Sequence, residues 1–154
     1  MPYDDFFLKI AFQEAQKAAL KLEVPVGAVI VKDQHIIAKA HNLKESQNLA
    51  TSHAEILAIQ KASRKLQDWR LIDCTLYITL EPCPMCAGAI IQSRIKRVVY
   101  SALDFKWGAV QSKVELFKAK LFNHQVEAEY LPMEESRLLL KHFFIERRKS
   151  GIKN

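Results

Sequence analysis

Thr51-Ser52-His53-Ala54-Glu55 and Glu81-Pro82-Cys83-Pro84-Met85-Cys86 are the most informative stretches of this chain. As patterns they read H-x-E and then P-C-x-x-C. One imidazole and two thiolates can fill three corners of a tetrahedral zinc site and leave the fourth for water, which is typical of catalytic zinc. We therefore expect one Zn²⁺ per chain, held by His53, Cys83 and Cys86.

Glu55 follows the histidine by two residues and is not needed as a ligand. Zinc lowers the pKa of its bound water from about 15.7 to about 7, so hydroxide becomes available at neutral pH. A carboxylate beside that water can take its proton and deliver it to a substrate. We expect Glu55 to be this acid and base. The simpler alternative is a first-turn partner for the helix dipole.

A C-x-x-C pair has two other common interpretations, a redox pair and half of a structural zinc site. A structural site would need a fourth Cys or His at matching spacing, and the remaining cysteine, Cys74, stands alone before a strand-like run. A redox pair would leave His53 and Glu55 unexplained. The compound motif therefore favours catalytic zinc.

The composition is that of an ordinary globular protein. A chain of 154 residues suits one domain, 1–154. The net charge of +6 favours an anionic partner without naming one. Two of the three cysteines belong to C-x-x-C, which indicates a reducing compartment. We see neither a secretion signal nor an apolar run of about 20 residues, so we expect no membrane association and a cytoplasmic protein.

Hydrophobic periodicity predicts alternating helices and strands. We expect a first helix capped by Asp4 or Asp5, and a helix capped by Thr51 or Ser52 that ends at Leu66. Further helices are expected at 84–92, at 114–119 and from 132–133 onward, and strands at 26–31, 36–40, 75–80, 97–102 and 125–131. Segments 43–50 and 103–113 are expected to be loops.

The order of these elements predicts an α/β protein, a three-layer α/β/α sandwich on a mixed five-stranded sheet. The first two strands form a hairpin, and the later strands run parallel through a right-handed crossover. Both ligand segments then lie at helix N-termini, where the dipole favours the thiolates of Cys83 and Cys86 and a neutral His53 imidazole.

The motifs resemble the zinc-dependent cytidine/deoxycytidylate deaminase superfamily. The likeness is closer to the bacterial tRNA-specific adenosine deaminases and covers nearly the whole chain. It is carried by Val24-Pro25-Val26-Gly27-Ala28-Val29, Ala40-His41-Asn42, His53-Ala54-Glu55, Trp69-Arg70-Leu71, the run from Thr75 to Cys83, Met85-Cys86-Ala87-Gly88-Ala89-Ile90, Ser93-Arg94-Ile95 and Phe122-Asn123-His124.

This resemblance implies a cytidine-deaminase-like fold and a specific reaction. Zinc-bound hydroxide would attack C6 of the adenosine at the wobble position of a tRNA anticodon. Glu55 would carry protons to N1 and to the departing ammonia, which leaves inosine. The family also implies a homodimer whose partner is the tRNA anticodon arm.

The same resemblance suggests residues that bind the substrate. Asn42 would hydrogen-bond the target nucleoside, although a turn residue is its alternative interpretation. Phe144 matches a position near bound RNA, and with Arg147 and Arg148 it could hold nucleotides beside a flipped base. Core packing is the alternative for Phe144. Glu81 could anchor the loop that carries Cys83.

Two departures from the family pattern keep other functions open. Pro84 also occurs in the related guanine deaminases, so a small-molecule nucleobase deaminase acting on guanine or cytosine is the main alternative. Phe105 and Trp107 stand where smaller residues are usual, which affects the expected anticodon contacts. A zinc-stabilised RNA-binding module without turnover is a third possibility, and it requires Glu55 to be dispensable.

Overall fold

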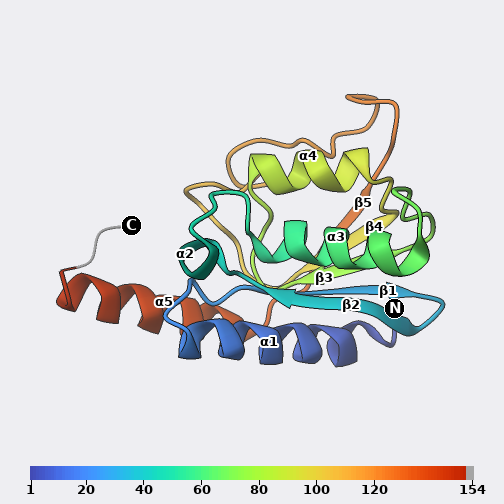
Figure 1. The fold of residues 1–154 in the computed structure, drawn as a ribbon. Helices are drawn as coiled ribbons and strands as arrows, with labels where there is room; N and C mark the ends of the chain where they lie inside the picture. Colours follow the sequence, from blue (N-terminus) through green and yellow to red (C-terminus); the bar gives the residue numbers. More distant parts are fainter. Residues whose placement is uncertain (152–154) are drawn as a thin grey trace.

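A mixed five-stranded sheet in the order β2-β1-β3-β4-β5 forms the middle layer of the computed structural model, which describes residues 1–151 (Figure 1). The elements are α1 (Asp4–Leu20), β1 (Gly27–Lys32), β2 (His35–His41), α2 (Lys44–Gln47), α3 (Ala54–Leu66), β3 (Thr75–Ile78), α4 (Pro84–Gln92), β4 (Arg97–Tyr100), β5 (Glu127–Tyr130) and α5 (Glu134–Lys149).

The strand directions agree with the prediction from sequence. β1 pairs antiparallel with both β2 and β3, whereas β3, β4 and β5 are parallel neighbours. Figure 1 shows α3 and α4 on one face of the sheet and α1 and α5 on the other. The predicted three-layer α/β/α sandwich is therefore confirmed.

Each face of the sheet has its own apolar core, because successive side chains of a strand point to opposite faces. Leu76 and Ile78 of β3 pack on the side of α3 and α4, and Tyr77 between them packs toward α1. At the start of β1, a Cβ on Gly27 would overlap the backbone of α1 at Ala11. The absence of a side chain there lets α1 lie directly on the sheet.

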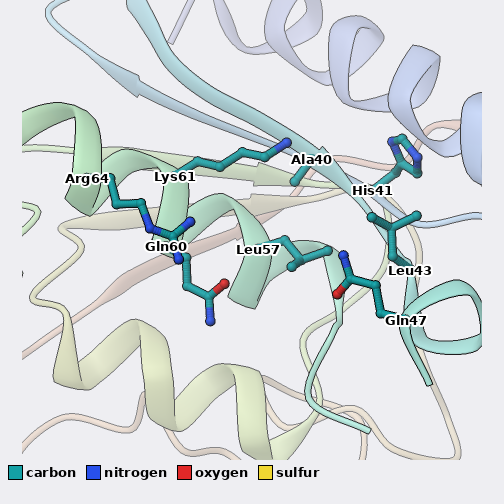
Figure 2. Close-up of a pocket in the computed structure, with 8 residues that line it drawn as sticks. All are labelled: Ala40, His41, Leu43, Gln47, Leu57, Gln60, Lys61 and Arg64. Carbon is teal, nitrogen blue, oxygen red and sulfur yellow. The ribbon is translucent and has the colours of Figure 1, made fainter. Parts of the chain in front are cut away.

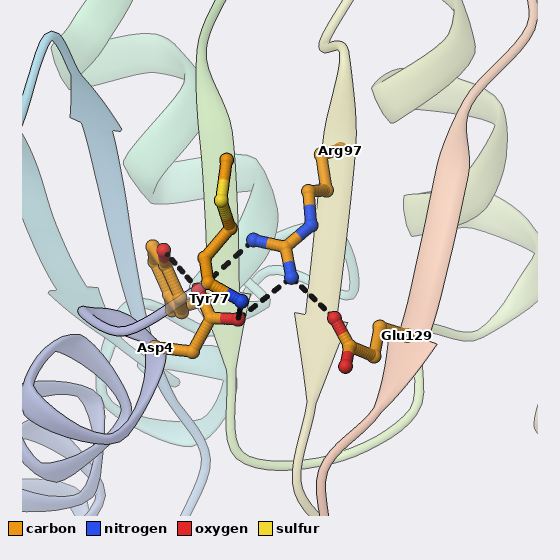
Figure 3. Close-up of polar contacts among 5 residues, drawn as sticks. Asp4, Tyr77, Arg97 and Glu129 are labelled. Atoms are coloured by element: carbon orange, nitrogen blue, oxygen red, sulfur yellow. Dashed lines mark hydrogen bonds and ion pairs between the residues drawn. The ribbon is translucent and has the colours of Figure 1, made fainter.

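A polar cluster connects the first turn of α1 to the inner parallel strands β3 and β4 (Figure 3). Arg97 of β4 donates to both carboxylate oxygens of Asp4, at 2.9 and 2.7 Å. Tyr77 of β3 donates to the same carboxylate at 2.7 Å, and Arg97 also pairs with Glu129 of β5. Burial alone would raise the pKa of Asp4, but the bonds from Arg97 and Tyr77 lower it to about 2.

Two local predictions were wrong. The expected loop 43–50 contains α2, whose N-terminus is capped by the carboxylate of Glu23 through the backbone N–H groups of Glu45 and Ser46, at 2.9 and 2.6 Å. The expected helix 114–119 runs as turns and bends. Its Leu116 packs against the core, and the Leu116 N–H donates to Ala109 O at 3.0 Å.

The predicted helix caps were also displaced. α1 begins at Asp4 after Tyr3, so Asp4 and Asp5 lie in the first turn. The Ser52 hydroxyl donates to the side chain of Gln47 at 2.6 Å, and the N-cap of α3 is His53. Among the residues that the structure describes, no helix is long and apolar enough to cross a bilayer.

Candidate active site

His53 and Cys83 occupy equivalent positions in two different helices, because each is the N-cap residue of its helix. His53 precedes α3 with φ −75° and ψ 154°, and Cys83 precedes α4 with φ −76° and ψ 173°. Extended backbone is the usual conformation of an N-cap residue. Cys86 lies in the first turn of α4, after Pro84 at the first helical position.

The three predicted metal ligands converge. One donor atom each from His53, Cys83 and Cys86 lies within 4.8 Å of the others. His53 Nδ1 is 3.6 Å from the Cys83 sulfur and 3.5 Å from the Cys86 sulfur. Zn–N bonds of about 2.0 Å and Zn–S bonds of about 2.3 Å at a tetrahedral angle place N and S about 3.5 Å apart. The geometry therefore fits one Zn²⁺ with a fourth position left for another ligand.

The charges of the three donors depend on one another. The Cys86 thiol hydrogen-bonds the Cys83 sulfur and lowers the pKa of Cys83 to about 4. The pKa of Cys86 is raised by its contact with Cys83 and by burial. The hydrogen bond to Cys83 also raises the pKa of His53. One thiolate is thus already favoured in the protein alone, and thiolate is the form that binds metal.

Glu55 lies in the first turn of α3, two residues after the predicted ligand His53, and its side chain is almost fully buried. Burial raises the pKa of Glu55 to about 7, and the neighbouring Cys83 sulfur acts in the same direction. His53, Cys83 and Cys86 all influence this pKa, so the carboxyl group lies beside the predicted ligands. Glu55 is therefore close enough to exchange protons with a group bound there.

Asn42 follows β2, and its side chain is engaged locally in the structure. Its amide nitrogen donates to Val24 O, and its oxygen accepts from the Lys44 N–H, both at 3.3 Å. These long hydrogen bonds hold the chain between β2 and α2. They are the contacts expected of a turn residue. A substrate that hydrogen-bonds the Asn42 side chain would have to replace one of these two bonds.

The residues of α5 that were predicted to contact RNA differ in their exposure and in the contacts they already make. Phe144 is half-buried against the main core. The Arg147 guanidinium pairs with Glu45 of α2 at 3.4 Å and lies 5.4 Å from the centre of the Phe143 ring. Arg148 is exposed. Figure 1 shows that α5 extends past α1 on the side where α2 lies.

A pocket of about 310 Å³ lies between the end of β2 and the outer side of α3 (Figure 2). Apolar and polar side chains line it together, and Lys61 and Arg64 are at one end with Gln47 at the other. Lys61 also donates to Lys39 O on β2 at 2.9 Å. The three metal donors do not line this pocket, so it is a feature beside the candidate metal centre and not the centre itself.

Sequence reasoning identified Glu81 as an anchor but did not identify its partners. The buried carboxylate accepts hydrogen bonds from the segment after β4, including the N–H of Gln111 at 2.8 Å and the hydroxyl of Ser112 at 2.5 Å. Burial raises the pKa of Glu81, and these bonds outweigh burial and lower it. No local pattern predicts partners about 30 residues away.

Comparisons with known proteins agree with this fold and site. The MafB19-like deaminase family model matches residues 3–148. The tRNA-specific adenosine deaminase of Aquifex aeolicus is 50% identical over 140 residues, which are 91% of this chain and 93% of the relative. A solved structure from studies of A-to-I editing by tRNA:A34 deaminases has a TM-score of 0.84 at 40% identity and covers 88% of this chain and 99% of that chain.

A guanine deaminase from Bacillus subtilis is also similar, with a TM-score of 0.64 at 32% identity over 97% of this chain and 95% of its own. The fold and the His/Cys/Cys cluster thus define a deaminase of the MafB19-like class. Within that class, the chain belongs to the tRNA-specific adenosine deaminase family.

Proposed function

We propose that this protein hydrolyses the adenosine at the wobble position of a tRNA anticodon to inosine, with release of ammonia. The observation that carries the proposal is the convergence of His53, Cys83 and Cys86 beside the buried Glu55, in a chain 50% identical to a tRNA-specific adenosine deaminase. The 32% identity to a guanine deaminase is lower, so the tRNA substrate is favoured.

The chain would hold Zn²⁺ through His53 Nδ1 and the sulfurs of Cys83 and Cys86. Zinc in such a site makes hydroxide available at neutral pH. Glu55 takes the proton from the attacking water and delivers it to N1 of the adenine ring. It then takes the second proton of the same water, from the oxygen now bonded to C6, and delivers it to the amino group, which leaves as ammonia. The burial of Glu55 keeps bulk water away from these transfers.

We infer that the anticodon arm is held by Asn42 and by the end of α5. Arg148 is exposed and free to contact a phosphate, whereas Arg147 already pairs with Glu45 and supports the last turns of α5. Phe144 can contact a base with the part of its ring that the core leaves exposed. Asn42 would exchange its bond with Lys44 or Val24 for one with the target nucleoside.

The homodimer and the cytoplasmic location stay predictions. The three free cysteines suit a reducing compartment. Light scattering on the purified protein measures the oligomeric state directly.

The substrate is tested by comparing kcat/KM for an anticodon stem-loop with a wobble adenosine, free adenosine, guanine and cytosine at one salt concentration. We expect turnover of the stem-loop and negligible turnover of free adenosine. Binding energy from nucleotides around the target can align the reacting ring, so a truncated substrate should lose kcat as well as affinity. Faster deamination of guanine would instead identify a small-molecule enzyme.

A further inference from the structure

Glu81 is the centre of a hydrogen-bond network that sequence reasoning did not anticipate. It lies between β3 and the ligand Cys83, and its side chain is only 2% exposed. Its Oε1 atom accepts from the Asp104 N–H at 3.1 Å and from the Ser112 hydroxyl at 2.5 Å. Its Oε2 atom accepts from the N–H groups of Val110, Gln111 and Ser112, at 3.1, 2.8 and 2.9 Å. One carboxylate thus organises the whole segment 104–112.

The segment is folded around this carboxylate. It has no helix or strand, although Gly108, Ala109 and Val110 within it are buried. Buried N–H groups need acceptors, and here Glu81 supplies several of them. A Cβ on Gly108 would overlap the Glu81 carboxyl group, so the backbone approaches the side chain as closely as a glycine allows.

The same segment contacts the turn that carries Cys83. The Ala109 N–H donates to Pro82 O at 2.8 Å, and just before the segment Ala102 O accepts from the Glu81 N–H at 2.8 Å. Pro82 immediately precedes Cys83. The peptide that leads into the metal-donor residue is therefore held by the segment that Glu81 organises.

We propose that Glu81 is a positioning residue that sets the place of Cys83 in the metal centre. It acts through the segment 104–112 and its bond to Pro82. The proposal rests on the zinc site of the proposed function, but not on the identity of the RNA substrate. Hydrogen-bonded groups behind metal ligands commonly change metal affinity or activity by 10- to 100-fold when they are replaced.

The test is the Zn²⁺ affinity of purified Glu81→Gln, measured by competition with a chromophoric chelator. Glutamine keeps the size of the side chain but places an NH₂ group against N–H donors that need an acceptor. We expect at least 10-fold weaker zinc binding. Asp4→Asn is the matched control, because Asp4 is a buried carboxylate with several partners on the opposite face of the sheet. It should lose stability but keep its zinc affinity.

Gly108→Ala gives a second variant that leaves the charge of Glu81 intact. Its Cβ displaces the carboxyl group or the segment, so zinc affinity should fall in the same direction. Ser112→Ala removes one hydrogen bond and should have a smaller effect. If Glu81→Gln does not fold, Gly108→Ala and Ser112→Ala decide the question.

Zinc affinity within two-fold of the parent protein in folded Glu81→Gln or in folded Gly108→Ala would overturn the proposal. An equal loss in Asp4→Asn would do the same, because Glu81 would then support only general stability. If the parent protein binds zinc but deaminates no stem-loop, the proposed tRNA substrate is wrong, and the zinc measurements still test the role of Glu81.

Discussion

At the scale of single residues, the chemistry depends on two helix N-caps that are not used as ordinary caps. Ser, Thr, Asp and Asn are preferred at N-caps because their side chains accept from the first N–H groups of the helix. His53 and Cys83 stand there instead and point toward each other. The N-termini of both helices therefore lie beside the cluster, and the helix dipoles favour negative charge there.

Replacement of Glu55 by glutamine separates metal binding from catalysis. The amide keeps the volume of the buried side chain but cannot transfer the proton. We expect zinc content and stem-loop affinity to stay near those of the parent protein, while kcat falls by about 10²–10⁴-fold. Single-turnover kinetics with zinc analysis of the same sample measures both. Turnover within a few-fold of the parent would show that Glu55 is not the acid and base of the reaction.

Cys86→Ala should reduce both zinc content and stability. Cys86 is fully buried and contributes one of the three donors, and metal-binding energy is shared with folding. Metal analysis after dialysis and urea unfolding with and without added Zn²⁺ are the measurements. Added zinc should stabilise the parent protein and have much less effect on the variant. Equal stabilisation of both would remove Cys86 from the ligand set.

At the scale of elements, the contact between α1 and β1 depends on Gly27. Gly27→Ala places a methyl group against the α1 backbone at Ala11, and overpacking of this kind typically costs about 1–3 kcal/mol. For a chain of this size each kcal/mol lowers Tm by roughly 2–4 °C. We therefore expect Tm to fall by several degrees in a thermal unfolding experiment.

Gly88→Ala is the matched control for Gly27→Ala. Gly88 lies in α4, and its added Cβ would meet no atom within 4 Å among the residues the structure describes. Alanine in a helix interior is favoured over glycine by about 0.5–1 kcal/mol, so Tm should stay equal or rise. A fall of Tm in both variants would show that the space at Gly27 is not the cause.

The polar cluster at the start of α1 predicts a pH dependence of stability. The pKa of Asp4 is lowered from 3.8 to about 2, so its contribution is fully present above pH 4 and is lost as pH falls through 2. The shift corresponds to about 2 kcal/mol, at 1.36 kcal/mol per pKa unit. In urea unfolding, the free energy of unfolding lost by Asp4→Asn should be about 2 kcal/mol larger at pH 7 than at pH 2.

The exposed neighbour Asp5 provides the comparison for Asp4. Asp5→Asn should change the free energy of unfolding by no more than about 0.5 kcal/mol at either pH, as is usual for surface substitutions. A pH-independent effect of Asp4→Asn would mean that lost packing, and not the ion pair with Arg97, is responsible.

Elements with a strong local pattern could be predicted from sequence, and elements made by distant contacts could not. The apolar run before Lys32 and the amphipathic pattern of α3 indicate their structures directly. α2 was missed because its cap, Glu23, lies more than 20 residues before it. The helix expected at 114–119 does not form, and the start of this segment is instead bound to the preceding one by bonds from Lys113 and Leu116 to Gly108 O and Ala109 O.

The same distinction applies to the site. The donors His53, Cys83 and Cys86 could be predicted from the sequence motifs. His53 lies at the start of α3, and Cys83 and Cys86 lie at the start of α4. The partners of Glu81 could not be predicted, since they are mostly backbone N–H groups, which any residue type supplies. The pairing of Arg147 with Glu45 likewise depends on how α5 packs beside α2.

At the scale of the whole molecule, the net charge of +6 and the basic last turn of α5 predict salt-dependent RNA binding. Each phosphate neutralised by Lys or Arg steepens the fall of log K with log salt. Arg148→Ala should weaken stem-loop binding and reduce the magnitude of the salt slope by about 1. Fluorescence anisotropy at several salt concentrations measures both quantities.

Lys9→Ala is the control for charge alone, because Lys9 is an exposed cation on α1. It should leave the slope unchanged. Equal effects of Lys9→Ala and Arg148→Ala would indicate attraction by the overall field, without a defined RNA contact on α5.

The bond between Lys61 and the Lys39 carbonyl has a consequence for behaviour in concentrated solution. β2 is an outer strand of the sheet, and outer strands offer backbone groups with which a strand of another molecule can pair. An ammonium group on one of these carbonyls occupies an acceptor and leaves a positive charge that repels another copy of the same edge. We therefore expect this side chain of α3 to hinder edge-to-edge pairing of two molecules along β2.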